Sequence, residues 1–289
     1  MFNAQYSMFN KISIFTIALL AMLSSCESPD LSNLDDSDTE ANLRVSIYQM
    51  GSTPFSALTR ATDNCTHINY AVYTMDGTRV KQINQQSGAA DFGSAVFQLE
   101  PDTYQLVVVA HSSNGNPTMT NPQKVQFTNS QGFTDTFLHY QTVQVTEEEQ
   151  NLSVTLDRIV SLCRVVFTDA LPADVATLQF QYTGGSGAFD ATTGFGCVKS
   201  TQKMTFNVES GQKEFDLYTF LHRAEDTIHL KVTALDSGGN VLYEREFDVP
   251  MKYNQITWFS GPFFGGGTGS TAITITINTD WAGETHVTF

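Results

Sequence analysis

The sequence predicts an all-β protein built from two tandem β-sandwich domains, and three observations support this prediction. Short runs that alternate apolar and polar residues recur from residue 43 to residue 278, and no segment in that range keeps a helical period for three turns. Turn residues separate these runs at short intervals. Aromatic residues are abundant, with 21 Phe, 10 Tyr and 2 Trp in 289 residues, and they pack well on a pleated sheet.

The first predicted domain covers residues 43–157, the length of one sandwich. Asp76-Gly77 separates two alternating runs, which is a strong signal for a tight hairpin. The run Val107-Val108-Val109-Ala110 is apolar throughout, as is typical of a strand in a sandwich core. Strands are expected at residues 43–48, 68–74, 78–83, 95–99, 104–110, 124–127, 136–145 and 152–156.

The second predicted domain covers residues 158–289, and Thr155–Arg158 marks the boundary between the two sets of strands. Ser237-Gly238-Gly239-Asn240 predicts another hairpin turn. Strands are expected at residues 159–167, 177–182, 203–208, 214–220, 228–235, 241–249, 255–259 and 271–278.

Residues 1–25 are predicted to be a lipoprotein signal peptide. Lys11 precedes an apolar run from Ile12 to Leu23, and this run is too short for a hydrocarbon core of about 30 Å. The sequence Leu23-Ser24-Ser25-Cys26 resembles a bacterial lipobox, which predicts lipid attachment at Cys26. The alternative is an ordinary small-residue cleavage site followed by an incidental Cys.

Residues 26–42 are predicted to be a disordered tether, because they contain no aromatic residue and are rich in Ser, Asn and acids. An acidic cluster just after a lipidated Cys resembles the signal that sends lipoproteins of the Bacteroides group to the cell exterior. The alternative is a solvated spacer. We therefore expect a protein anchored by lipid in the cell outer membrane and facing outward. The acids are Glu27, Asp30, Asp35, Asp36, Asp38 and Glu40.

Charge and motif spacing argue against nucleic acid, metal and catalysis. The chain has 15 Lys and Arg against 30 Asp and Glu, whereas a nucleic-acid partner requires clustered cations. The six His show no metal-ligand spacing. The run Glu147–Glu149 is expected in a solvated turn, Gly184–Ala188 in a flexible loop that lacks the nucleophile-elbow pattern, and Asp236–Asn240 at a hairpin end. No enzyme activity and no cofactor are expected.

Several remaining side chains have a structural interpretation. Cys65, Cys163 and Cys197 are expected to be small buried hydrophobes, with one disulfide possible among them. Arg158 and Arg164 would share a face if one regular strand carried both, and an ion pair with nearby acids explains them better than a ligand site does. The aromatic residues Trp258, Phe263, Phe264 and Trp281 are expected to fill the core; the alternative is a sugar-stacking platform.

An ordered set of motifs resembles the Bacteroidales fimbrillin-anchoring lipoproteins, the FimB-type minor subunits of type V pili. The resemblance covers most of the mature chain and implies two transthyretin-like (Ig-like) sandwiches, no cofactor, and a structural role that holds pilin subunits to the outer membrane. Its motifs are the lipobox, Cys65–Tyr73 with Asp76-Gly77, Pro101–Ser112, Thr134–Tyr140, Leu156–Ile159 and Asn254–Gly261 with Phe263-Phe264.

Pilus subunits associate by strand addition, and the C-terminal sequence fits such a device. Gly265–Ser270 forms a flexible joint, and the segment Ala272-Ile273-Thr274-Ile275-Thr276-Ile277 alternates strictly. This segment could be donated to a partner; alternatively, it is a strand of its own domain.

Polymerising type V pilins are also cut after an Arg, and Arg44 and Arg60 are candidates by position. Either cut would separate the sandwiches from the lipid, so an anchor should remain uncut, whereas a stalk or tip subunit would not. The competing class is a surface glycan-binding lipoprotein of a polysaccharide-utilisation system. Such a protein would expose two or three coplanar rings on a concave face.

Overall fold

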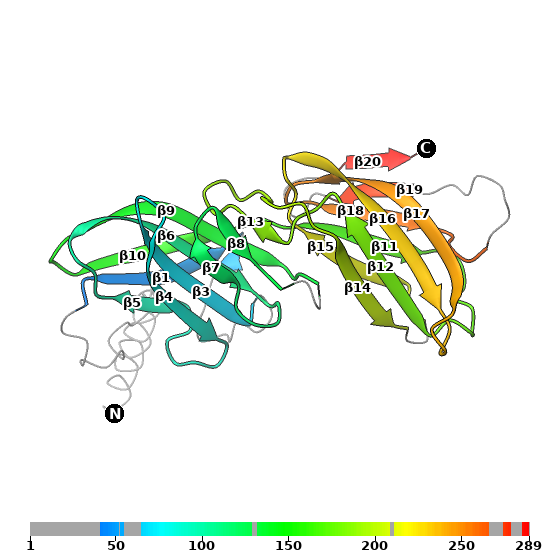
Figure 1. The fold of residues 1–289 in the computed structure, drawn as a ribbon, viewed down its shortest axis with the longest axis horizontal. Coiled ribbons are helices and arrows are strands. Elements are labelled where there is room, and N and C mark those ends of the chain that lie inside the picture. Colours follow the sequence, from blue (N-terminus) through cyan, green and yellow to red (C-terminus); the bar gives the residue numbers. More distant parts are fainter. Residues whose placement is uncertain are drawn as a thin grey trace, which may run out of the picture. The chain divides into compact units, whose positions relative to one another are not determined.

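The structure is a computed structural model (Figure 1), and it describes residues 41–51, 53–54, 65–128, 132–208, 211–265, 274–278 and 285–288. At 53–54, 274–278 and 285–288 the description covers the backbone alone. Residues 40–289 form one compact unit. The predicted boundary near residue 157 therefore remains a prediction.

Over the described ranges the chain forms strands and no helix, which confirms the all-β class. The described residues contain no helix that is long and apolar enough to cross a membrane. The strands are β1 (Leu43–Met50), β2 (Thr53–Pro54), β3 (His67–Thr74), β4 (Arg79–Gln86), β5 (Ser94–Phe97), β6 (Asp102–His111), β7 (Thr118–Asn121), β8 (Lys124–Gln126), β9 (Thr136–Val145), β10 (Gln150–Arg158), β11 (Ser161–Phe167), β12 (Thr177–Thr183), β13 (Ala188–Phe189), β14 (Gln202–Asn207), β15 (Glu214–Thr219), β16 (Glu225–Leu235), β17 (Val241–Lys252), β18 (Ile256–Gly261), β19 (Thr274–Asn278) and β20 (Thr285–Thr288).

The first sheet has eight strands in the order β2-β1-β10-β9-β6-β3-β4, with β5 also paired to β1. Strand β10 runs parallel to β1 over most of its length and pairs with β9 only at its last two residues. Alternate residues of β1, β3 and β6 meet in one hydrophobic core, so β10 joins two layers that pack face to face. The first set of strands thus forms two layers around one core.

Strands β3 and β6 are buried on both faces. Val108 and Ala110 lie in the first core, whereas Val107 and Val109 lie in a second cluster on the opposite face of the sheet. A strand covered on both sides needs no polar residue at alternate positions, which explains the unbroken apolar run in β6.

The later strands form a five-stranded sheet, β15-β11-β18-β19-β20, and a four-stranded sheet, β14-β12-β16-β17. Side chains from the two sheets meet in a core rich in phenylalanine, including Phe167, Phe180 and Phe215. The rings of Phe180 and Phe215 lie 5.3 Å apart. The two later sheets thus enclose a core of their own.

A small three-stranded sheet, β13-β8-β7, combines a late strand with two early ones. Phe189 of β13 pairs with Val125 of β8. Strands β2, β7, β13 and β20 were not predicted, because strands of two to four residues carry too little periodicity. Each predicted strand is present. Strand β11 was expected to begin at residue 159 but begins at Ser161, and Ile159 and Val160 pack in the second cluster.

Both predicted hairpin turns are present and are fixed by aspartate side chains. Gly77 has a φ of 87°, which favours glycine, and Asp76 accepts hydrogen bonds from Thr74 and from the Thr78 backbone N–H. Asp236 accepts backbone hydrogen bonds from Gly238 and Asn240, each 2.8 Å long. Hydrogen bonds lower the pKa of both carboxyl groups. The largest cause is the side-chain bond from Thr74 for Asp76 and the side-chain bond from Asn240 for Asp236.

The predicted tether ends one residue too late. The side chain of Asn42 donates to Leu99 O at 2.7 Å and to Thr146 O at 2.9 Å, and its oxygen accepts from Leu99 N at 3.0 Å. Because three hydrogen bonds hold this buried amide, Asn42 belongs to the folded part.

Candidate functional site

The predicted strand-exchange segment lies within the five-stranded sheet. Its residues Thr274, Ile275, Thr276 and Ile277 belong to β19, which pairs antiparallel with β18 on one side and β20 on the other. Ala272 and Ile273 lie outside the described residues. In the register, Ile275 pairs with Phe259 and Ile277 pairs with Thr257. Phe259 and Thr257 are buried. The segment thus occupies a position in its own sheet, and its donation to a partner remains a prediction.

Sheet edges are the places where a strand can be added, because their outer backbone groups lack a strand partner. The five-stranded sheet ends at β15 and β20, and the four-stranded sheet ends at β14 and β17. Strand β17 carries Glu244, Glu246, Asp248 and Pro250, and such residues discourage pairing. The β17 edge is therefore a poor acceptor of a partner strand.

The predicted processing site at Arg44 lies inside β1. This strand is parallel to β10 on one side and antiparallel to β5 on the other. Val45 is fully buried, and the Arg44 side chain lies 3.6 Å from a Glu149 carboxylate oxygen. A protease would have to extract this part of β1 before cutting after Arg44. Arg60, the signal peptide, the lipobox residues Leu23, Ser24 and Ser25, and Cys26 all lie outside the described residues.

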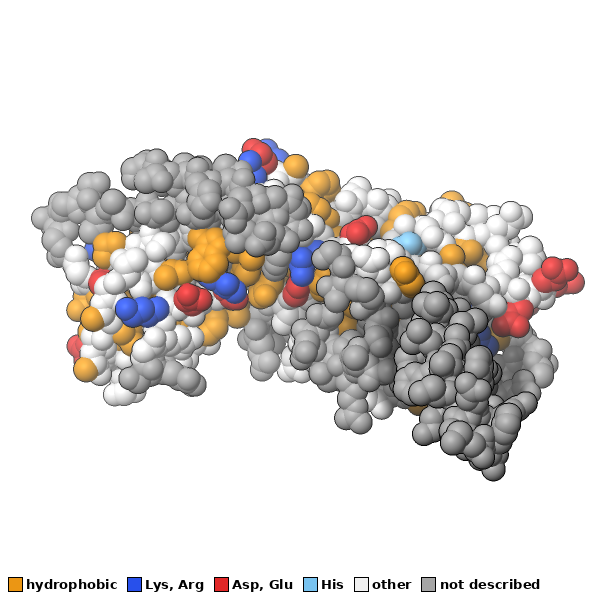
Figure 2. Space-filling model, turned by 180° about the vertical axis from the view of Figure 1, so that it is seen from behind, with side chains coloured by type: hydrophobic (Ala, Val, Ile, Leu, Met, Phe, Trp, Pro, Cys, Tyr) orange, Lys and Arg blue, Asp and Glu red, His pale blue; other side chains and the backbone are white. Residues whose placement is uncertain are grey.

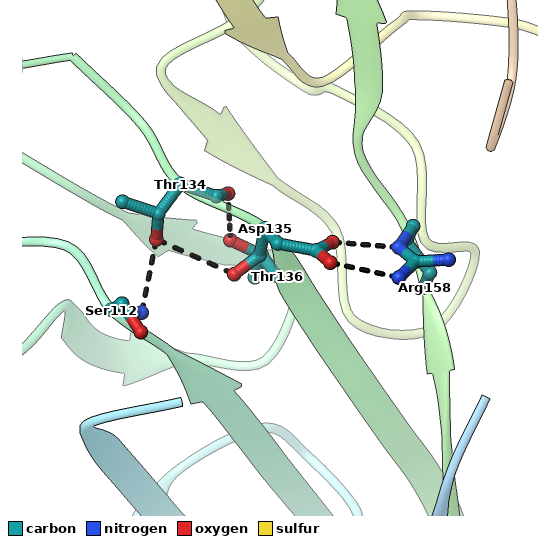
Figure 3. A network of polar contacts seen from close by, with 5 residues as sticks. All are labelled: Ser112, Thr134, Asp135, Thr136 and Arg158. Carbon is teal, nitrogen blue, oxygen red and sulfur yellow. Dashed lines mark hydrogen bonds and ion pairs between the residues drawn. The ribbon is translucent and has the colours of Figure 1, made fainter. Parts of the chain in front are cut away.

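A polar network joins two of the family-like motifs (Figure 3). Arg158, at the end of β10, donates from Nε and Nη2 to the two carboxylate oxygens of Asp135 at 2.7 and 2.8 Å. Its guanidinium also lies 4.8 Å from the centre of the Phe137 ring. A half-buried bidentate pair of this kind fixes the end of β10 against the start of β9. The sequence presents the two motifs separately and gives no signal of their contact.

The same network reaches the end of β6 through Thr134. The Thr134 hydroxyl accepts the Ser112 backbone N–H at 2.9 Å, and the Thr136 hydroxyl donates to Thr134 O at 2.9 Å. Next to it, the Ser113 backbone N–H donates to Nδ1 of the buried His111 at 3.1 Å. Three strand ends are thus tied together at one point.

The second arginine also forms an ion pair, as expected, but the two arginines do not share a strand. Arg164 of β11 contacts both carboxylate oxygens of Asp216 at 2.7 Å and lies 5.0 Å from the centre of the Trp258 ring. Hydrogen bonding to Asp216 raises the pKa of Arg164. Residues 159 and 160 separate β10 from β11, so one regular strand does not carry both arginines, and the condition for a common face is not met.

We call the second cluster the junction core, because its residues come from both sets of strands. Phe220 lies 5.9 Å from Phe127, 5.4 Å from Phe133 and 5.0 Å from Phe189, measured between ring centres. The buried residues of the junction core are Ala71, Tyr73, Val107, Val109, Met119, Val125, Phe127, Phe133, Leu138, Ile159, Val160, Phe189, Ala191 and Phe220.

The glycine-rich segment after β12 is packed rather than free, so the prediction of a flexible loop is wrong. A Cβ atom on Gly185 would lie 1.9 Å from the Thr219 hydroxyl oxygen, and one on Gly184 would lie 2.3 Å from Thr227 O. Ser186 is fully buried and accepts the Val198 backbone N–H at 3.1 Å. These glycines allow close approach of neighbouring strands.

The cysteines differ in part from the prediction. Cys65 and Cys163 are buried, and burial raises the pKa of the Cys65 thiol to about 12. Cys197 is exposed, because it lies in the turn region after β13 rather than on a core-facing strand position. All three are free thiols, so the possible disulfide among them is not formed.

The remaining candidates are metal ligands, surface cations and the acidic run at residues 147–149. In the part of the chain that the structure describes, no three His, Cys, Asp or Glu side chains come together as a metal site would require. On the face shown in Figure 2, most Lys and Arg side chains lie next to Asp or Glu rather than in a patch. Glu147–Glu149 lies between β9 and β10, where Glu149 meets Arg44.

Of the four aromatic residues expected to fill the core, Phe263 and Phe264 do so. Phe263 and Phe264 are buried with their rings at 88° to each other, and Trp258 is half-buried beside Arg164. Trp281 lies outside the described residues. Of the large hydrophobic side chains exposed in the described ranges, Tyr48 is the one aromatic. That part of the chain thus has no platform of exposed coplanar rings.

Comparisons with known proteins agree with this architecture. Residues 34–289 match the model of a family of unknown function, DUF6562. The curated proteins contain no match. A candidate polysaccharide-binding protein (DUF1812) from Bacteroides thetaiotaomicron has 11% identity and a TM-score of 0.51, with 86% of this chain and 98% of that chain covered. At this identity the similarity is one of fold.

Two further solved structures are similar. The fimbrial anchor protein Mfa2 from Porphyromonas gingivalis has 14% identity and a TM-score of 0.48, with 86% of this chain and 99% of that chain covered. A candidate adhesin from Bacteroides ovatus has 15% identity and a TM-score of 0.49, with 78% and 88% covered. Because the family match spans nearly all of the sequence after the predicted leader, this chain belongs to the DUF6562 family.

Proposed function

We propose that this protein is a structural subunit of a type V fimbria, anchored by lipid in the outer membrane and engaging pilin subunits by strand exchange. The observation that carries the proposal is the position of β19. It follows the predicted glycine-rich joint and is held in its sheet by backbone pairing with β18 and β20. Because such pairing depends mainly on main-chain groups, a strand of similar alternation from another subunit can replace it.

The setting of Arg44 supports an anchor rather than a stalk or tip subunit. An anchor must keep its lipidated residue joined to the folded part. A cut after Arg44 would require β1 to leave both β10 and β5, and Val45 to leave the core.

Strand exchange predicts a crosslink from β19 to a neighbouring subunit. A photocrosslinking amino acid in place of Thr276 should give a covalent adduct with a pilin in assembled fimbriae, detected by mass spectrometry. The same probe in place of Tyr48, which is exposed on β1, should give little or none. Intramolecular products alone at position 276 would argue that β19 stays in its own sheet.

Lipid anchoring predicts that Cys26→Ala moves the protein from the detergent phase to the aqueous phase in a phase-partition experiment. Acyl chains contribute about 0.8 kcal/mol per buried CH₂, so their loss removes the predicted attachment. Cys197→Ala is the matched control, because Cys197 is an exposed thiol in the folded part. Partitioning of Cys26→Ala like the parent chain, or an N-terminus at Val45 on purified fimbriae, would contradict the anchor.

Binding of a surface glycan is the second candidate. The solved structure with a TM-score of 0.51 is named for polysaccharide binding, and that name favours the candidate. The burial of Phe263 and Phe264 counts against it, since stacking on sugars needs exposed rings. Saturable binding of a purified polysaccharide, lost on Tyr48→Ala, would favour a glycan binder over a fimbrial subunit.

A further inference from the structure

A single carboxylate holds the segment that leads from β18 toward β19. Asp169 lies two residues after the end of β11. Its Oδ1 accepts the Phe263 backbone N–H at 3.0 Å, and its Oδ2 accepts those of Phe264 and Gly265 at 2.5 and 2.7 Å. Three consecutive N–H groups that converge on one carboxylate fix the backbone of residues 263–265 strongly, because bonds to a charged acceptor are the stronger kind.

The side chains of this segment are held as firmly as its backbone. Phe263 and Phe264 are 2% and 8% exposed and lie in the core between the five- and four-stranded sheets. From β17, Arg245 donates to Pro262 O at 3.2 Å, and its guanidinium lies 5.9 Å from the centre of the Phe263 ring. None of these contacts involves β19.

The attachment of β19 is of a different kind. It pairs with β18 along the register from Ile256↔Asn278 to Ser260↔Thr274. On its other side β18 pairs in parallel with β11, from Ile256 to Gly261. Removal of β19 would therefore leave β18 held by β11 along its length and by Asp169 just beyond its end.

From this geometry we propose that Asp169 is a positioning residue for strand exchange. It holds residues 263–265 in place while β19 leaves β18, so that the exposed β18 edge keeps its shape and can receive a partner strand. Without it, only the core packing of Phe263 and Phe264 and the contacts of Arg245 would hold this segment, and the β18 edge would be fixed less firmly. The inference rests on the proposed strand exchange.

The carboxylate has to be charged and has to offer both oxygens. An asparagine would keep one acceptor oxygen and turn an NH₂ group toward N–H donors, which would break at least one of the three bonds. Burial tends to raise the pKa of Asp169, but the three backbone hydrogen bonds outweigh it, and the net shift is downward. The group is thus ionised at neutral pH.

The test compares Asp169→Asn with Asp174→Asn in the full chain. Asp174 lies in the same connection between β11 and β12, and its side chain is exposed, so the control makes the same chemical change without touching the segment. Hydrogen exchange at the amides of residues 263–265 should be about tenfold faster or more in Asp169→Asn, and unchanged in Asp174→Asn.

The second readout is the yield of the crosslink from position 276 to a pilin. We expect Asp169→Asn to lower this yield severalfold relative to the parent chain and to Asp174→Asn. An unchanged yield despite faster exchange overturns the positioning role and leaves strand exchange intact. Unchanged exchange at residues 263–265 would show that Asp169 does not hold this segment, and would overturn the inference. If the parent chain gives no crosslink, strand exchange fails and the inference fails with it.

Discussion

Phe220→Ala is expected to destabilise both sets of strands at once, by about 3–5 kcal/mol, which is the usual cost of removing a large buried ring. Phe220 is fully buried and follows β15, yet two of its ring partners, Phe127 and Phe133, belong to the earlier set of strands. A cavity at this position removes contacts from the underside of the β3–β6 sheet as well as from the later strands.

The measurement needs one probe in each set of strands. Both tryptophans of the chain, Trp258 and Trp281, lie in the later part of the sequence, so fluorescence during urea unfolding reports on that part. Hydrogen exchange at the amides of Val107–Ala110 reports on β6. In Phe220→Ala the fluorescence transition should occur at a lower urea concentration, and hydrogen exchange in β6 should become faster.

Phe180→Ala is the matched control for this prediction. Phe180 is also fully buried, but it belongs to the core between the five- and four-stranded sheets and not to the junction core. Phe180→Ala should lower the urea concentration at the midpoint of the fluorescence transition. It should change hydrogen exchange in β6 much less than Phe220→Ala does. If Phe220→Ala leaves β6 exchange at the parent level, the junction core does not couple the two sets.

The strands could be predicted from the sequence, whereas the junction core could not. Alternation along β1 and the unbroken apolar run in β6 both follow from local burial. The pairing of Phe189 with Val125 joins residues far apart in the chain through a two-residue strand, and no local pattern reports such a contact. The same limit applies to the bidentate contact between Arg158 and Asp135, because a charged residue shows its partner only in three dimensions.

At Gly184, Gly185 and Cys197 the sequence led to a prediction that the structure contradicts. A glycine-rich segment is compatible with a free loop and with a close approach of backbones, and only the packing of Thr219 and Thr227 against the two glycines decides between them. An isolated cysteine is most often buried, but the segment after β13 lies outside a regular strand and leaves Cys197 exposed. Local sequence is ambiguous wherever tertiary contacts set the environment.

Acid should destabilise the protein through His111, starting well above the range in which carboxylates titrate. His111 is fully buried, and its ring lies 4.9 Å from Phe127 and stacks on His67 at 5.1 Å. Its Nδ1 accepts the Ser113 backbone N–H, so Nε2 carries the proton and donates to Asn69 Oδ1 at 2.9 Å. The neutral ring is satisfied at both nitrogens, and a second proton has no acceptor.

Burial first, and the neighbouring His67 second, lower the pKa of His111 from 6.5 to about 3. Above pH 6.5 the ring is neutral in both the folded and the unfolded chain, and its contribution to stability is complete. As the pH falls below 6.5, the unfolded chain binds a proton that the folded chain does not. The free energy of unfolding therefore decreases by about 1.4 kcal/mol per pH unit until the pH approaches 3.

His111→Gln should flatten this dependence, because glutamine can accept from Ser113 and donate to Asn69 without titrating. Between pH 6.5 and 4.5 the parent chain should lose about 2.3 kcal/mol more of its free energy of unfolding than this variant does, measured by urea unfolding at each pH. His229→Gln is the control for removing an imidazole outside the core, because the His229 side chain is 64% exposed on β16, where it contacts Asp248. Equal slopes for His111→Gln and the parent chain would show that His111 does not hold a depressed pKa in the folded state. A slope that flattens equally in His229→Gln would show that the effect is not specific to the buried ring.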